Sequence, residues 1–262
     1  MSNQKIPFIE ASGCGNAFLI VQQSEVPAEE RSQVSVRLCG PGADGVEWIA
    51  PSTSDDADVD AILINADGSE AELSGNGTRC VAAHWVSEHG GDVVRVRTGA
   101  GVKVCKLTAR DGNDFEFEIN FGAPNIEGML EMTLPVGKCK GMRIDMGNPQ
   151  YVVFVENFDF DWKKRGAEIQ GKKVFANGVN VVFVRVLRSS DVEARFFERG
   201  VGATQSSGTG SCAAAVASIA ADLVVSPVRV RAEGGPQVVT WDGGDVILRG
   251  PASIQGPGVF VL

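Results

Sequence analysis

Apolar residues along this chain occur mostly in short runs or at every second position, which is the period of a half-buried β-strand. Valine, isoleucine and phenylalanine dominate these segments, and glycine, proline, aspartate and asparagine separate them at short intervals. The segments expected to form strands are 34–38, 61–65, 93–98, 102–110 and 115–121 in the first half, and 151–157, 179–187, 193–199, 228–233, 237–241 and 245–250 in the second. The pattern predicts an α+β fold with antiparallel-rich sheets.

Two segments break this pattern and are rich in small residues. Residues 80–88 carry Ala82 and Ala83, and residues 212–223 hold six alanines. A helix that is apolar on nearly every face is buried inside a protein. We therefore expect two pseudo-symmetric domains, each a β-barrel-like sheet wrapped around its own central helix.

The length of 262 residues favours two domains of roughly 100–150 residues each. The formal net charge of −9 argues against a nucleic-acid partner, because phosphate binding requires a basic surface. No apolar run reaches the ~20 residues that cross a bilayer, and residues 1–10 lack the features of a signal peptide. These features predict a cytoplasmic protein with no membrane partner.

Six cysteines are scattered without a C-x-x-C pair, and the two histidines are His84 and His89. This spacing does not favour a structural metal site, so no metal is expected. Reduced, buried thiols are the better interpretation in a reducing compartment. Both histidines fall in the first predicted helix or just beyond it, where we expect them to be packed or solvated.

A short motif occurs twice, each time at the entrance of a predicted central helix. Ser74-Gly75-Asn76-Gly77 precedes the first helix, and Ser207-Gly208-Thr209-Gly210 precedes the second. Free backbone N–H groups and the positive end of the helix dipole favour an anion there, and glycines let it approach. Two such motifs could hold one carboxylate from both sides. Helix capping by serine is the structural alternative, and phosphate binding is disfavoured because neither segment matches a known phosphate loop.

Six segments together resemble the diaminopimelate epimerase family over essentially the whole chain. They are GCGNAF (13–18), GPGADG (40–45), INADGSEAELSGNGTRC (64–80), MGNPQYVVFV (146–155), NVVFV (180–184) and ERGVGATQSSGTGSCAAAVA (198–217). The resemblance implies two barrel-like domains that close over a small amino-acid substrate, and a homodimer. It also implies that the C-terminal end returns to the first domain, so we expect domains at 1–118 plus 251–262 and at 119–250.

The resemblance implies an isomerase that inverts an α-carbon by two-base proton transfer without any cofactor. In the family, one cysteine thiolate removes the α-proton and a second cysteine returns a proton on the opposite face. At the two aligned positions this chain has Ser74 and Ser207. A serine hydroxyl is a far weaker acid than a cysteine thiol, so its ionisation costs on the order of 10 kcal/mol more than that of cysteine. A helix dipole contributes about 2 kcal/mol at best. A serine base therefore needs a partner that accepts its proton, and the sequence offers only poor candidates.

The binding residues of the family are present by resemblance. Glu198 is expected to take the α-ammonium group of the substrate. The two helix tips are expected to hold the reacting carboxylate through Gly75, Asn76, Gly77, Gly208 and Thr209. The distal end of the substrate is assigned to Asn16, Asn65, Asn148, Asn180 and Arg199, since a guanidinium can bind a carboxylate with two hydrogen bonds. Gln150 and Ala203 depart from the family, which usually has histidine and glutamate at these positions.

Three hypotheses follow from the sequence. In the first, the chain is an isomerase that converts LL- to meso-diaminopimelate in lysine biosynthesis, or acts on a related amino acid, with Ser74 and Ser207 as its catalytic residues. In the second, it is a catalytically impaired relative that binds an amino acid. In the third, both serines are engineered replacements that inactivate an enzyme.

Overall fold

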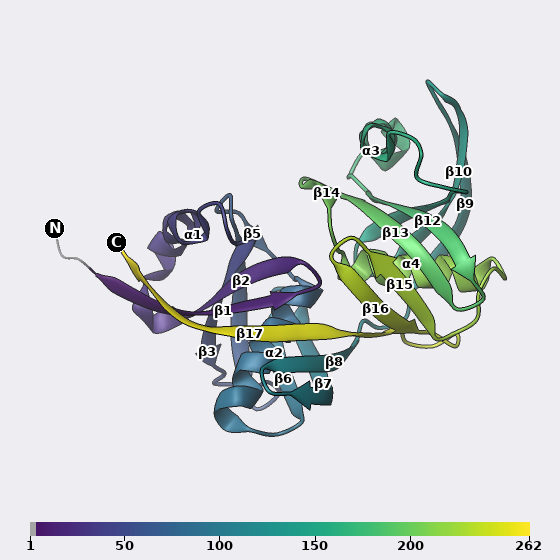
Figure 1. The fold of residues 1–262 in the computed structure, drawn as a ribbon. Helices are drawn as coiled ribbons and strands as arrows, with labels where there is room; N and C mark the ends of the chain where they lie inside the picture. The colour runs from purple at the N-terminus through teal and green to yellow at the C-terminus, as the bar shows by residue number, and fades with distance from the viewer. Residues whose placement is uncertain (1–3) are drawn as a thin grey trace. The chain divides into compact units, whose positions relative to one another are not determined.

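The computed structural model describes residues 4–262, and the chain divides into two compact units. Unit 1 comprises residues 1–119 and 250–262, and unit 2 comprises residues 120–249 (Figure 1). Each unit contains a curved sheet, a central helix that the sheet surrounds, and a further helix on the outer side of the sheet.

The sheet of unit 1 begins with β1 (Lys5–Gly13), which is antiparallel to β2 (Asn16–Gln22), and β2 is parallel to β3 (Gly45–Pro51). β3 is antiparallel to β4 (Val59–Asn65), which pairs with the short β5 (Glu70–Ala71) and, in parallel, with β6 (Val93–Thr98). β7 (Gly101–Asp111) and β8 (Asp114–Asn120) continue the series. The last strand, β17 (Ile247–Val261), pairs with both β8 and β1 and closes the sheet.

The sheet of unit 2 repeats this pairing pattern strand for strand. β9 (Asn125–Leu134) and β10 (Gly137–Asp145) lead to β11 (Pro149–Phe154), which is parallel to β12 (Asn180–Arg188). β12 is antiparallel to β13 (Asp191–Glu198), which pairs with the short β14 (Gly202–Thr204) and, in parallel, with β15 (Val228–Ala232). β16 (Gly235–Thr240) then joins β15 to the start of β17. The sequence β2 to β6 in unit 1 thus corresponds to β11 to β15 in unit 2.

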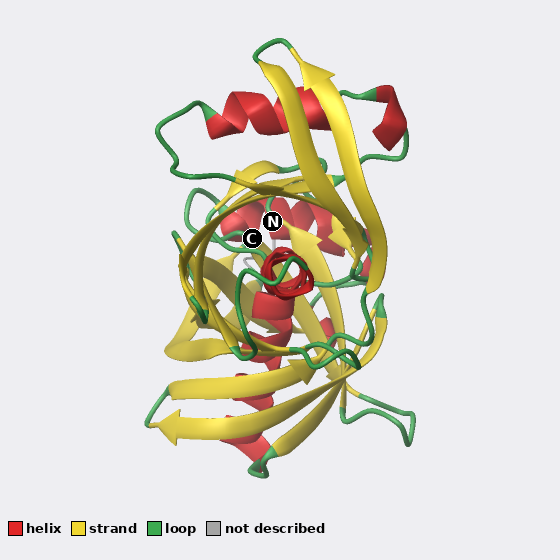
Figure 2. Cartoon of the chain, turned by 90° about the vertical axis from the view of Figure 1, so that its right-hand side faces the viewer, coloured by secondary structure: helices red, strands yellow, loops and turns green. Residues whose placement is uncertain are grey.

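A helix of small residues fills each barrel. In unit 1, α2 (Gly75–His89) packs against β1, β2, β3, β4, β6 and β7; in unit 2, α4 (Gly208–Ala220) packs against β10 to β13, β15 and β16. Residues 80–83 and 212–217 are fully buried. Figure 2 shows α4 end-on inside a ring of strands. Small side chains let the sheet close around the helix at this short distance. The expected fold class, α+β with two pseudo-symmetric barrels around central helices, is confirmed.

The outer helices correct the sequence analysis. Residues 34–38, expected to form a strand, belong to α1 (Arg31–Cys39), which follows two short 3₁₀ helices, η1 (Gln23–Glu25) and η2 (Ala28–Glu30). The strand prediction was wrong because Val34 and Leu38 are buried one helical turn apart, packed with Val46 and Trp48 of β3. In unit 2, the sequence analysis did not predict α3 (Trp162–Gln170) and η3 (Lys173–Phe175).

The central helices also begin earlier than the sequence suggested. The expected segments started at Cys80 and Cys212, whereas the observed helices start at Gly75 and Gly208, directly after the two serines. The glycine-containing motifs are therefore the first helical turns themselves and not loops that lead into them. The second helix ends at Ala220, three residues before the expected end, and Asp222 beyond it has a positive φ of 56°.

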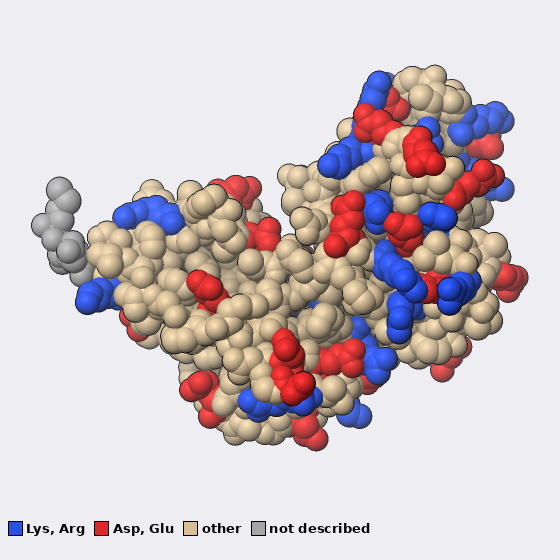
Figure 3. All heavy atoms as spheres, viewed as in Figure 1, with Lys and Arg blue, Asp and Glu red and all other residues tan. Residues whose placement is uncertain are grey.

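Acidic and basic side chains are interspersed on the molecular face drawn in Figure 3, which shows no continuous basic surface. This distribution agrees with the net charge of −9. Among the helices of residues 4–262, none is both long and apolar enough to cross a membrane.

Candidate active site

Each central helix is capped by the serine of its repeated motif. Ser74 Oγ accepts a hydrogen bond from Gly77 N over 3.1 Å, and Ser207 Oγ accepts one from Gly210 N over 3.2 Å. Both serines thus have the capping role that the sequence left open as a structural alternative. The cap occupies one of the four N–H groups that the first turn of a helix presents. We call the residues around Ser74 the N-terminal half-site and those around Ser207 the C-terminal half-site.

Ser207 has a hydrogen-bond acceptor that the sequence analysis did not find. Its Oγ donates to Glu198 Oε2 over 3.0 Å, and Thr204 Oγ1 donates to Glu198 Oε1 over 2.6 Å. Burial raises the pKa of the Glu198 carboxyl, while the hydrogen bonds from Thr204 and Ser207 lower it. The sequence places Glu198 nine residues before Ser207, and only the turn between β13 and β14 brings the two side chains together.

Gln150, which stands where the family usually has histidine, organises the polar side chains of the C-terminal half-site. Its Nε2 donates to Asn148 Oδ1 over 2.7 Å and to Thr209 Oγ1 over 3.2 Å. Asn148 Nδ2 also donates to Thr209 Oγ1 over 3.3 Å. Gln150 is 1% exposed, and its Oε1 has no hydrogen-bond partner among the residues that the structure describes. The structure thus brings together Asn148 and Thr209, two of the predicted binding residues.

Asn180 and Arg199, also predicted to bind substrate, lie at the start of β12 and in the turn directly after β13. Asn180 Oδ1 accepts a hydrogen bond from the backbone N–H of Arg199 over 2.9 Å, and its Nδ2 donates to Pro149 O over 3.3 Å. The Arg199 guanidinium donates to Asn177 O over 3.0 Å. Asn180 therefore links three segments of the half-site through main-chain groups.

The N-terminal half-site contains a chain of amide contacts. Asn76 Nδ2 donates to Asn16 Oδ1 over 2.7 Å, and Asn16 Nδ2 donates to Asp44 Oδ2 over 3.2 Å. The fully buried Arg79 donates to Asn76 Oδ1 and, over 3.0 Å, to Pro251 O of β17. The structure thus brings together Asn16 and Asn76, which the resemblance assigned to the distal end and to the reacting carboxylate of the substrate. The sequence analysis missed Arg79, whose position three residues after Asn76 on the predicted helix was the available signal.

Asn65 has a different environment from the other predicted binding residues. Its Nδ2 donates to Ser69 Oγ over 3.0 Å, and its backbone N–H donates to Ser69 O over 2.8 Å. Asp67 accepts hydrogen bonds from Ser69 in the same turn. Asn65 therefore stabilises the turn between β4 and β5 in this structure, and its contact with a substrate stays a prediction.

A buried carboxyl group lies beside the first turn of α2. Glu47 of β3 is 3% exposed, and a Cβ placed on Gly77 would come within 2.0 Å of Glu47 Oε1. A side chain at position 77 would therefore have to displace the Glu47 carboxyl. Burial raises the pKa of Glu47 to about 8. The sequence analysis did not single out Glu47, and it did not predict β3, the strand on which Glu47 lies.

Among the cysteines, Cys14 contacts the N-terminal half-site, since its Sγ accepts a hydrogen bond from Arg79 over 3.6 Å. Cys80 and Cys212 are fully buried, and burial strongly raises the pKa of the Cys80 thiol. Burial lowers the pKa of His84, and His89 stacks on Trp85 at the end of α2. Within residues 4–262, no cluster of three or more His, Cys, Asp or Glu side chains could hold a metal ion.

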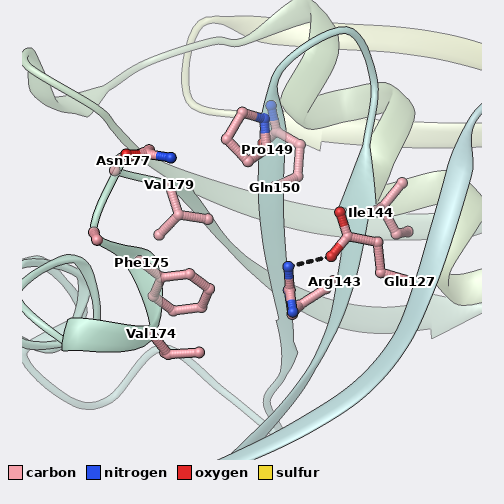
Figure 4. Close-up of a pocket in the computed structure, with 11 residues that line it drawn as sticks. Glu127, Arg143, Ile144, Pro149, Gln150, Val174, Phe175, Asn177 and Val179 are labelled. Atoms are coloured by element: carbon pink, nitrogen blue, oxygen red, sulfur yellow. Dashed lines mark ion pairs between the residues drawn. The ribbon is translucent and has the colours of Figure 1, made fainter.

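Unit 2 also contains an open cavity of about 240 Å³ between β10, β11 and the segment 174–179 (Figure 4). Gln150 and Pro149 line one side, and Phe175 lines the other. Arg143 and Glu127 form an ion pair at its wall. Because Gln150 also contacts Thr209, this cavity borders the C-terminal half-site.

Two barrels of this kind in one chain, each closed around a serine-capped central helix, define a fold that this chain shares with solved epimerases and PhzF-family proteins. A hydroxyproline epimerase from Agrobacterium vitis, solved with bound trans-4-hydroxy-L-proline, has a similar fold, with a TM-score of 0.79 and 16% identity over 99% of this chain and 92% of that one. A PhzF-family phenazine biosynthesis protein from Bacillus anthracis is also similar, with a TM-score of 0.76 and 14% identity over 98% of this chain and 99% of that one.

The sequence comparisons assign the family. The family model for diaminopimelate epimerase matches residues 8–126 and 142–254. The diaminopimelate epimerase of Halothermothrix orenii is 32% identical over 98% of this chain and 99% of its own length. That of Methanothrix thermoacetophila is 35% identical over 95% of this chain and 93% of its own length. The chain belongs to the diaminopimelate epimerase family, whose members are cofactor-independent isomerases, and the resemblance read from the sequence is confirmed.

Proposed function

We propose that this protein inverts the α-carbon of an amino acid by two-base proton transfer, with Ser74 and Ser207 acting on opposite faces of that carbon. The hydrogen bond from Ser207 to Glu198 is the observation that supports a catalytic serine. Ser207 Oγ takes the α-proton while its own hydroxyl proton passes to Glu198 Oε2. Serine never has to exist as a free alkoxide in this step, which avoids the cost of about 10 kcal/mol that its ionisation would add.

The substrate that we propose is LL-diaminopimelate, which is converted to the meso form in lysine biosynthesis. The curated relatives named diaminopimelate epimerase support this choice. We assign the reacting carboxylate to the helix tips and the α-ammonium to Glu198, since each of its carboxylate oxygens can accept a second hydrogen bond. The distal end is assigned to the asparagines of both half-sites and to Arg199.

We also propose that the protein works as a homodimer in the cytoplasm, which light scattering of the purified protein and cell fractionation would test.

Deuterium wash-in tests the proposed reaction. The protein is incubated in heavy water with each stereoisomer of diaminopimelate, and deuterium at the α-carbon is followed by NMR. We expect wash-in together with interconversion of the LL and meso forms. Absence of wash-in from every stereoisomer, although binding is measurable by calorimetry, would rule the reaction out.

The double substitution Ser74→Cys with Ser207→Cys tests whether the binding residues of the two half-sites support catalysis once both serines are replaced by thiols. Thiols ionise without a partner of the kind that serine needs, so the double variant is expected to epimerise diaminopimelate at least as fast as the parent protein. If the double variant epimerises diaminopimelate and the parent protein does not, the parent protein lacks only the two catalytic bases.

The second candidate is an amino-acid-binding relative with impaired catalysis. One observation favours it: the Ser74 hydroxyl donates no hydrogen bond to any residue within the described range 4–262. Tight binding of an amino acid with no α-carbon exchange in the parent protein would support this candidate over the isomerase.

A further inference from the structure

Glu47 and Ser74 converge on the same point above the first turn of α2. A Cβ at Gly77 would lie 2.0 Å from Glu47 Oε1 and 3.3 Å from Ser74 Cβ. Both side chains also line a cavity of about 10 Å³, together with Leu73 and Thr78. A cavity of this size is about that of one water molecule, so a single water can connect the carboxyl and the hydroxyl.

Glu47 is a polar group at a core position of the sheet. Val46 and Trp48 on either side of it pack with α1 on the outer face of β3, so Glu47 faces α2 inside the barrel. It forms no hydrogen bond with any residue that the structure describes. A carboxyl buried in this way costs several kcal/mol unless it has a partner, which makes a purely structural role a poor explanation.

Unit 2 has an apolar residue at the corresponding place. Glu47 pairs with Leu63 across the β3–β4 ladder, and Val182 pairs with Phe196 across the equivalent β12–β13 ladder. Val182 is 1% exposed and lies in the core around α4. The barrel therefore does not need a carboxyl at this position, and Glu47 has a role specific to unit 1.

The acid of the C-terminal half-site has no counterpart in the N-terminal one. In unit 2 the β12–β13 ladder pairs Val181 with Phe197, so the next pair along it is Asn180 with Glu198. The equivalent pair of the β3–β4 ladder in unit 1 is Gly45 with Asn65, so Asn65 stands at the position that corresponds to Glu198. An amide therefore stands where Ser74 would need an acid. Glu47 supplies a carboxyl to the same helix tip from the neighbouring strand.

We propose that Glu47 is the proton-transfer partner of Ser74, accepting its hydroxyl proton directly or through one water when Ser74 takes the α-proton, and returning it in the reverse direction. This inference rests on the proposed function. In the forward step the α-proton moves to Ser74 Oγ, the Ser74 hydroxyl proton moves to the Glu47 carboxylate, and the electron pair of the C–H bond stays on the α-carbon. When Ser74 donates a proton to the carbanion, Glu47 in its acid form restores the hydroxyl.

The strength of this acid suits the step. A carboxyl with a pKa of about 8 is a base comparable to the thiolate of cysteine, whose ordinary pKa is about 8.5. Ser74 and Glu47 together would thus replace one cysteine. The groups that surround Glu47 are Cys80, with which it interacts electrostatically, and Glu72, an exposed carboxyl that lines the same cavity.

The test compares proton exchange on the two faces of the substrate. Ser74→Ala first identifies the stereoisomer whose α-hydrogen faces Ser74, because its deuterium wash-in is lost while wash-in from the other stereoisomer continues at Ser207. Glu47→Gln is then expected to slow deuterium wash-in from that stereoisomer by at least ~100-fold. The rate of wash-in from the other stereoisomer, which exchanges at Ser207, is expected to stay unchanged. Glu72→Gln is the matched control and is expected to retain both. Ser74→Cys in the Glu47→Gln background is expected to restore exchange, since a thiolate needs no acceptor.

The outcomes separate the possibilities. Retained exchange on both faces in Glu47→Gln, equal loss on both faces, or the selective loss appearing in Glu72→Gln would overturn the pairing of Glu47 with Ser74. The pairing would also be overturned if Ser74→Cys supported exchange in the presence of Glu47 but failed to restore it in the Glu47→Gln background. Absence of exchange in the parent protein would instead reject the proposed function itself, and the role of Glu47 with it.

Discussion

Ser207 donates a hydrogen bond of 3.0 Å to Glu198, whereas Ser74 has no such acceptor within residues 4–262 and lies beside the buried carboxyl of Glu47. The two halves of the chain repeat the same strand pairing, yet they present their serines to different carboxyl groups from different strands. This asymmetry matters because the two faces of an α-carbon require opposite proton transfers.

The hydrogen bond from Thr204 to Glu198 is expected to lower the pKa of the carboxyl group that accepts the Ser207 proton. Thr204→Val removes a donor to the carboxylate, so the pKa of Glu198 should rise further and less of the base should be ionised at neutral pH. We expect the acidic limb of the pH–rate profile to move to higher pH and the rate at pH 7 to fall about tenfold. Thr240→Val on the exposed edge of β16 is the control, and an identical profile in both variants would contradict the expectation.

Glu47 is expected to make stability fall as the pH rises. Its pKa is raised from 4.5 to about 8 by burial, so its contribution is fully present below about pH 4.5 and is lost as the pH passes through 8. Between pH 5 and pH 8.5 the free energy of unfolding should therefore decrease by roughly 3–5 kcal/mol more in the parent protein than in Glu47→Gln. Urea denaturation of both proteins at the two pH values measures this difference. Parallel pH dependences would show that Glu47 ionises normally.

Gly77 is expected to resist substitution although it lies inside a helix. Gly77→Ala would normally gain about 1 kcal/mol of helix propensity, but its Cβ would collide with Glu47 Oε1. We expect a net loss of about 1–3 kcal/mol in thermal or urea unfolding. Gly244→Ala, in a loop with free space, serves as the comparison and should change stability by less than about 0.5 kcal/mol.

Arg79 is expected to hold the N-terminal half-site together. Arg79→Met removes the donors to the buried Asn76 Oδ1 and to Pro251 O, so we expect a loss of about 3 kcal/mol and weaker amino-acid binding. Lys106→Met, at an exposed position of β7, should leave both quantities nearly unchanged. Unfolding and calorimetric titration on the two variants give the comparison. A loss of stability without any loss of binding would place Arg79 outside the half-site.

The candidate site was only partly accessible from sequence. The repeated motif identified the helix tips, and resemblance identified residues such as Asn16 and Asn76 that the structure brings together. The partners of the serines were not accessible, because Glu47 comes 27 residues before Ser74 and lies on β3, which the sequence analysis did not predict. Contacts between residues distant in sequence depend on strand register, which the local pattern does not specify.

By itself the sequence determined the two buried helices, the duplicated helix tips, the family and many of the barrel strands, but not β1, β2, β3, β9 or β10. These features are local, since alternation, small-residue content and motif spacing are all read over short segments. Only the tertiary structure decided that residues 34–38 form a helix, that Glu198 accepts from Ser207 and that Glu47 lies against Gly77. Each of these depends on which side chains pack across the sheet, and burial there changes both the secondary-structure preference and the acidity of a group.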